Sequence, residues 1–306
     1  MALSFRKILC PIYFDETSPI ALEYARHFAK KTGGAIQLLH VVPTDEIHLL
    51  RKVYHPAEGG GGANIVWAEK IAQDMLLKLA EEHLSDIPHD IVTRTSSDPV
   101  TGILEAEKEL GSDLVIMATH GRTGLTHFIL GSVAEKIVRE SRTPVLTTRS
   151  GEKLGDAHPF RKILVPIDIA ERSNVALVCA RQLAEQFQGT VYPLHIVPND
   201  EAILRLRDVY HAKEGEHGAN LVLAEKTARQ RLQELAQEYL SDVPYETVLH
   251  VSGDPGKAII ETERDIGADL MVMATHGVTG ILHFLLRSLT EKMVRESDCP
   301  VLSLHQ

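Results

Sequence analysis

The chain has 306 residues, enough for two domains of ordinary size, each with its own apolar core. It has 32 lysine and arginine residues and 42 aspartate and glutamate residues, and the resulting net charge of −10 argues against a nucleic-acid partner. The cysteines, Cys10, Cys179 and Cys299, lack metal-ligand spacing and favour a reducing compartment. Since the longest apolar runs fall short of the roughly 20 residues that cross a bilayer, we expect a cytoplasmic protein with no membrane partner.

The first half alternates short apolar runs with amphipathic ones. In chain order we expect a strand at Lys7–Tyr13, a helix capped by Thr17-Ser18-Pro19 and ended by Gly33-Gly34, a strand at Ala35–Val42, a helix from Asn64 to about His83, a strand at His89–Thr95, a helix from Asp98-Pro99 to Leu110, a strand at Leu114–Ala118, a helix at Ser132–Glu140 and a strand at Val145–Thr148. Strands that alternate with helices predict a parallel sheet covered on both faces.

The second half repeats the first. Lys7-Ile8-Leu9 returns as Lys162-Ile163-Leu164, and Ala118-Thr119-His120-Gly121 returns as Ala274-Thr275-His276-Gly277. The period is far longer than a solenoid unit, so a whole domain has been duplicated. We predict one domain at residues 1–148, an exposed linker at 149–159, and a second domain at 160–306.

The loops after Tyr13 and Ala118 are the expected ligand site, because such sheets bind ligands beyond the carboxyl ends of their strands where the strand order reverses. Gly121 follows Ala118, and Gly131-Ser132 comes nine residues later at the start of a helix. A glycine there lets a phosphate approach main-chain N–H groups at the positive end of the helix. The same residues also suit a plain turn and a helix cap, and spacing alone leaves both interpretations open.

Three segments together resemble the universal stress protein family. They are Ile8–Ile12, Leu39–Val42, and the run Ala118-x-x-Gly121-x9-Gly131-Ser132-Val133-Ala134-Glu135-Lys136 followed by Thr143–Leu146. The resemblance spans both halves. It implies two tandem doubly wound parallel five-stranded sheets of order 3-2-1-4-5, an adenine-nucleotide alpha-hydrolase-like fold and, in one branch of the family, ATP bound between the first and fourth strands.

The resemblance also implies roles for individual residues. Pro11 and Val41 would line the adenine, Ala118 stands at the first glycine of the family's pattern, and ribose and phosphates, with or without Mg2+, would meet Gly121, Gly131, Ser132 and Val133. The equivalents in the second half are Asp168, Gly277 and Ser288.

Each half departs from the family's ATP-binding pattern. The family's first strand ends in an aspartate, which the second half has as Asp168 and the first half replaces with Tyr13, leaving Asp15 as a candidate substitute. Arg287 replaces the second half's counterpart of Gly131, where it either blocks phosphates or pairs with an anion. We therefore expect ATP in the first half.

The histidines suggest a metal site, but their spacing does not favour one. His55-x-x-Glu58 and His211-x-x-Glu214 supply two ligands per half, fewer than a zinc site needs, so we predict no metal site. His40 and His195 end apolar strands and are expected in the core or at a subunit contact. No Ser-His-Asp order, acid–base carboxylate pair or Walker-type lysine loop can be assembled.

We therefore expect a stress-response regulator that signals through nucleotide-dependent contacts with a protein partner. Two alternatives stay open: a scaffold that binds no nucleotide, and a slow ATP-hydrolysing enzyme. We further predict that the halves form an intramolecular pseudo-dimer through Val145–Thr148 and Val301–Leu304, because edge strands need covering. Whole chains are also expected to self-associate.

Overall fold

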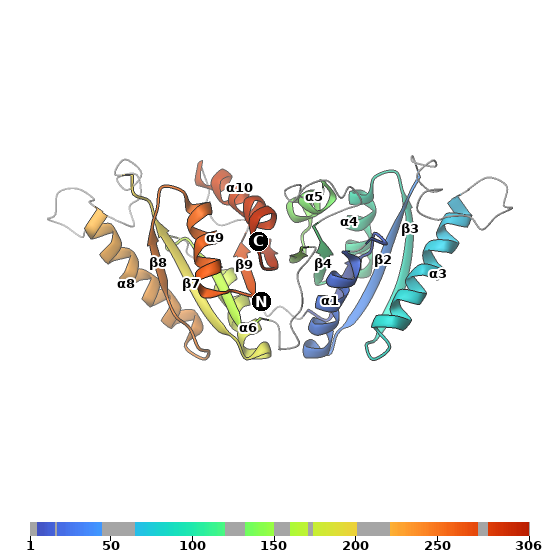
Figure 1. The fold of residues 1–306 in the computed structure, drawn as a ribbon, viewed down its shortest axis with the longest axis horizontal. Helices are drawn as coiled ribbons and strands as arrows, with labels where there is room; N and C mark the ends of the chain where they lie inside the picture. Colours follow the sequence, from blue (N-terminus) through green and yellow to red (C-terminus); the bar gives the residue numbers. More distant parts are fainter. Residues whose placement is uncertain are drawn as a thin grey trace. The chain divides into compact units, whose positions relative to one another are not determined.

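The protein is represented by a computed structural model, which describes residues 5–15, 17–44, 65–119, 132–149, 160–170, 174–200, 221–274 and 281–305, with backbone alone at 132 and 281–288. The chain divides into two compact units, Ser4–Leu154 and Gly155–Gln306. Each is an α/β unit in which helices flank a sheet (Figure 1). Within the described ranges, no helix is long and apolar enough to span a membrane.

The first half contains a five-stranded parallel sheet of order β3-β2-β1-β4-β5. Its elements are β1 (Lys7–Pro11), α1 (Ser18–Thr32), β2 (Ala35–Pro43), α3 (Ile65–His83), β3 (His89–Ser96), α4 (Pro99–Leu110), β4 (Leu114–Ala118), α5 (Ser132–Glu140) and β5 (Val145–Thr148). The order that the family resemblance implies is confirmed.

The second half repeats this sheet in the order β8-β7-β6-β9-β10, again with parallel neighbours. Its elements are β6 (Lys162–Pro166), α6 (Val175–Phe187), β7 (Thr190–Val197), α8 (Leu221–Leu240), β8 (Val248–Val251), α9 (Pro255–Ile266), β9 (Leu270–Ala274), α10 (Ile281–Glu296) and β10 (Val301–Leu304). The duplication read from the sequence is therefore a duplication of fold.

Helices cover both faces of the first sheet, as successive residues of β2 show. Val42 packs with Ala68 and Ala72 of α3. The preceding residue, Val41, faces α4 instead, where it lies against Gly102. Since successive side chains of a strand point to opposite faces, α3 and α4 lie on opposite sides of the sheet. The inner strand β4 is accordingly buried along its whole length.

The helix caps largely follow the sequence signals. Asp98 accepts hydrogen bonds from the main-chain N–H groups of Val100 and Thr101 at the start of α4, and Gly111 ends that helix in the left-handed conformation at φ 61°. At the ends of α9, Asp254 accepts from the main-chain N–H of Lys257, and Gly267 has φ 65°. The local sequence therefore determines these helix ends, because aspartate supplies the acceptor and glycine tolerates the positive φ.

The end of the first strand differs from the expectation. β1 stops at Pro11 rather than at Tyr13. The Tyr13 N–H donates to the Ser18 hydroxyl at 3.3 Å instead of to a neighbouring strand, and Phe14 turns the chain with φ 54°. A non-glycine residue at positive φ costs conformational energy, so the loop after β1 is held by its surroundings.

Candidate functional site

The strand order of the first half reverses between β1 and β4. These strands pair directly, with Ile8 opposite Leu114 and Leu9 opposite Val115, although β2 and β3 come between them in the chain. Their carboxyl ends, at Pro11 and Ala118, therefore open at the same edge of the sheet. This is the position at which doubly wound sheets bind ligands.

The loop after β1 is anchored to β2 by main chain and by a histidine. The Ile12 N–H donates to the Leu39 carbonyl at 2.8 Å. Nδ1 of buried His40 lies 2.6 Å from the Ile12 carbonyl, an acceptor, so this nitrogen carries the proton. Phe14 packs against the same imidazole, with ring centroids 4.5 Å apart. His40 therefore holds the edge of the candidate site, in agreement with its expected place in the core.

The second half reproduces this anchor. Nδ1 of His195 lies 3.0 Å from the Ile167 carbonyl, and the Ile167 N–H donates to Leu194 at 2.9 Å. The strand-end aspartate Asp168 follows, and its Oδ1 accepts from the Ala170 N–H at 3.0 Å. The two sites thus share a scaffold and differ in the residue that follows it, Asp168 in one half and Tyr13 in the other.

Tyr13 is half-buried and its hydroxyl oxygen is shielded from solvent, with no hydrogen-bond partner in the part of the chain that the structure describes. Burial raises the pKa of this hydroxyl above its ordinary value of 10.0, and the negative charge of Asp15 raises it further. The phenol therefore keeps its proton at neutral pH. Its O–H group can therefore donate a hydrogen bond, and no described residue accepts it.

Thr17 stands at the N-cap position of helix α1, within the expected Thr17-Ser18-Pro19, but the side chain that caps the helix is Asp15. Its Oδ1 accepts from the main-chain N–H groups of Thr17 and Ser18, both at 3.1 Å, and from their hydroxyls at 2.7 and 3.0 Å. The other oxygen, Oδ2, is shielded and has no partner among the described residues. Thr17 makes no side-chain cap bond of its own, and its hydroxyl donates to Asp15, whose carboxylate follows the turn at Phe14.

The other predicted site residues are only partly described. Pro11 and Ala118 are buried at the ends of β1 and β4, whereas Val41 and Val133 are half-buried. Gly121, Gly131 and Gly277 lie outside the described residues, as do His55, Glu58, His211 and Glu214. Ser132, Arg287 and Ser288 lie in helices α5 and α10 as backbone alone. After Ala118, Thr119 donates to the Thr148 carbonyl from its N–H at 2.8 Å and from its hydroxyl at 3.1 Å.

The described residues hold no group of three or more His, Cys, Asp or Glu side chains that could bind a metal ion. Cys10, Cys179 and Cys299 are buried free thiols. Burial raises the pKa of Cys10 to about 12, which keeps the thiol protonated and unreactive.

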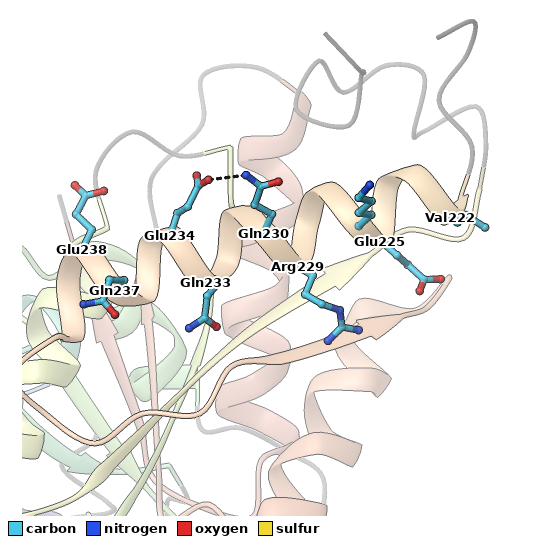
Figure 2. Close-up of a pocket in the computed structure, with 9 residues that line it drawn as sticks. Val222, Glu225, Arg229, Gln230, Gln233, Glu234, Gln237 and Glu238 are labelled. Carbon is cyan, nitrogen blue, oxygen red and sulfur yellow. Dashed lines mark hydrogen bonds between the residues drawn. The ribbon is translucent and has the colours of Figure 1, made fainter.

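A hollow of about 1100 Å³ lies elsewhere, along helix α8 (Figure 2). It is lined by Val222, Glu225, Lys226, Arg229, Gln230, Gln233, Glu234, Gln237 and Glu238. All of these residues come from one helix, and within the row Gln230 donates to Glu234 at 3.0 Å. Because no strand end contributes to it, this hollow does not coincide with the candidate site.

The fold and the strand-end site define a class: a duplicated doubly wound α/β domain whose site opens where the strand order reverses. The Universal stress protein family matches residues 4–149 and 159–305. The chain belongs to the universal stress protein family, once in each half.

Relatives of both one and two domains are similar to this chain. A universal stress protein of Methanocaldococcus jannaschii is 31% identical over 160 residues, which are 49% of this chain and 98% of that protein. One from Mycobacterium tuberculosis is 26% identical over 249 residues, 79% of each chain. The crystal structure of a universal stress protein from Archaeoglobus fulgidus aligns over 98% of both chains with a TM-score of 0.69 and 20% identity, a likeness of fold.

Proposed function

We propose that this protein is a stress-response regulator that binds ATP in its first half, beyond the ends of β1 and β4, and signals through nucleotide-dependent contacts with a protein partner. Family membership supports the general role. The strand reversal between β1 and β4 supports the place.

The observation that carries the choice of half is the pair of shielded polar atoms after β1. Neither the Tyr13 hydroxyl nor Asp15 Oδ2 has a partner in the described ranges. Buried polar groups are nearly always paired, and leaving one unpaired costs about 1–3 kcal/mol. The phenol needs an acceptor and the carboxylate needs a donor. A nucleoside carries both on its base and on its sugar, so its chemistry fits this pair.

The remaining roles follow the family resemblance. Pro11 and Val41 would contact adenine, and Gly121, Gly131, Ser132 and Val133 would contact ribose and phosphates, next to Ala118. When bound, Mg2+ neutralises phosphate charge, and carboxylate oxygen is a ligand that it prefers. Asp168 offers such an oxygen in the second half, and in the described loop after β1 of the first half the shielded Oδ2 of Asp15 offers one. We also propose a cytoplasmic location, which the three free cysteines favour.

Calorimetry with ATP, with and without Mg2+, tests the assignment. We expect one ATP per unmodified chain. Gly131→Arg should abolish binding, because a long side chain blocks the approach of phosphates to the main chain. Arg287→Gly should raise the stoichiometry to two if Arg287 plugs the second site, whose Asp168 is already in place.

Arg287→Lys is the matched control, since it keeps a long cation and should leave one site. If ATP binding survives Gly131→Arg and disappears in Asp168→Ala, the second half is the site and Arg287 is a phosphate ligand. If the unmodified chain binds no ATP, the proposal fails.

A scaffold that binds no nucleotide is the second candidate, because Tyr13 stands where the family's ATP-binding pattern has aspartate. The calorimetric result for the unmodified chain separates the two. A slow ATPase is distinguished by incubating bound ATP with the protein: a regulator returns ATP, and an enzyme returns ADP and phosphate.

A further inference from the structure

Helix α4 approaches β2 unusually closely at one glycine. A Cβ atom built on Gly102 would lie 2.8 and 3.1 Å from the two γ-carbons of Val41 and 3.2 Å from Cβ of Ser96. Carbon atoms normally meet at about 3.5–4.0 Å. An alanine at position 102 would therefore have to displace Val41 by up to about 1 Å.

Val41 has little freedom to give way. It is β-branched, so its side chain has few allowed rotamers. Its backbone pairs with Arg94 of β3, and the preceding residue, His40, is tied to the loop after β1. A larger side chain at position 102 would therefore displace Val41 together with the neighbouring backbone at the edge of the site.

The second half is built differently at the same place. Its equivalents are Ala258 and Ile196, each one carbon larger than its counterpart in the first half. The second half carries its own close glycine two residues earlier in the helix, at Gly256, where a Cβ would meet the end of the Lys292 side chain. The contact between Gly102 and Val41 is thus particular to the first half.

We propose that Gly102 positions Val41 against the base of a bound adenine nucleotide and so sets the width of this part of the first half's site. The inference rests on the proposed function for its ligand, but the contact itself can be tested without one. Gly102 is a positioning residue, since it acts through Val41.

The first test is whether Gly102→Ala raises or lowers the stability of the chain. Alanine is favoured over glycine inside a helix, so Gly102→Ala should raise the midpoint of urea unfolding if the space is slack. We expect the midpoint to fall, because overlap with Val41 outweighs this gain. In a Val41→Ala background, which removes both γ-carbons and leaves Cβ of Ser96 as the remaining close atom, the same substitution should lower the midpoint much less. If Gly102→Ala alone does not fold and the double variant does, the contact is equally supported.

The second test is ATP affinity, measured by calorimetry where every variant is folded. Gly102→Ala should weaken ATP about tenfold, as expected when a wall of the site shifts by a large fraction of an ångström. In the Val41→Ala background it should weaken ATP no further. Gly256→Ala is the matched control: it is also a helical glycine, but its neighbour is the end of a pliable lysine, so ATP affinity should not change.

A rise in the urea midpoint for Gly102→Ala in the unmodified background, with ATP affinity unchanged, overturns the positioning role. If Val41→Ala relieves the loss of stability caused by Gly102→Ala, but the unmodified chain binds no ATP, the contact stands and the proposed function is overturned, and with it the role of Gly102 toward the base. The two failures are therefore distinguishable.

Discussion

At the scale of single residues, Tyr13 gives the sharpest difference between the halves. Its hydroxyl has lost water without gaining a partner in the described structure. Tyr13→Phe keeps the ring and removes that unpaired group, so without nucleotide we expect the free energy of unfolding to rise by about 1 kcal/mol. With ATP present, affinity should fall if the hydroxyl donates to the ligand. Urea unfolding and calorimetry measure the two effects.

Tyr245→Phe is the control, for which we expect no gain in the free energy of unfolding. The Tyr245 hydroxyl donates to Gln237 at 3.0 Å, so its removal should leave stability unchanged or slightly lower. If Tyr13→Phe destabilises the ligand-free chain, the hydroxyl is already paired in solution, and the fit of a nucleoside to Tyr13 and Asp15 loses its support.

At the scale of elements, the N-cap of α4 makes stability depend on pH. The Thr101 hydroxyl and main-chain N–H groups donate to Asp98, and Lys136 adds a positive charge, which together lower the pKa of the carboxyl below 3.8. A lowered folded pKa means that the unfolded chain binds the proton first. The stabilisation is therefore complete above about pH 4 and is lost as pH falls through the folded pKa.

Two substitutions separate the cap from its charge. Asp98→Ala should lower the free energy of unfolding by about 1 kcal/mol at neutral pH. Asp98→Asn retains an acceptor for the helix but cannot titrate, so it should keep most of the stability and flatten its dependence between pH 2 and pH 5. If the pH profile of Asp98→Asn matches that of the unmodified chain, Asp98 is not the group that titrates.

The caps also illustrate what sequence can predict. Asp98-Pro99 and Gly111 are local signals, and their roles were predicted correctly because the partners lie within one turn of the helix. At the start of α1 the position of Thr17 was also predicted, but the side-chain cap was not, because the carboxylate of Asp15 accepts from the Ser18 N–H after a turn in which Phe14 has positive φ. A residue of that type gives no sequence signal for such a turn.

The candidate site shows the same limit. Its place at the ends of β1 and β4 follows from alternating strands and helices, since that pattern allows few topologies. The contact between Gly102 and Val41 could not be predicted, because it depends on the distance between a helix and a strand far apart in the chain. The unpaired Tyr13 hydroxyl is likewise a property of packing and not of spacing.

At the scale of the whole molecule, duplication raises the question of how two similar sheets share one chain. Within each half, β5 and β10 stand at one end of the strand order. A strand at the end of a sheet has N–H and C=O groups that need partners or cover. Two equivalent edges on one chain can satisfy one another, and their closeness in the chain raises their effective concentration. We therefore propose that β5 and β10 join the halves as a pseudo-dimer.

Hydrogen exchange tests this join in the intact chain. The amides of β5 that point away from β4 should be protected, although no described strand of their own half follows β5 on that side in the strand order. Ser303→Pro removes a donor from β10 and should speed exchange in β5, in the other half of the molecule. Leu249→Pro damages β8, at the opposite end of the second half's strand order, and should leave β5 protected. Rapid exchange of those β5 amides in the unmodified chain, or equal effects of both prolines, would contradict a join through β5 and β10.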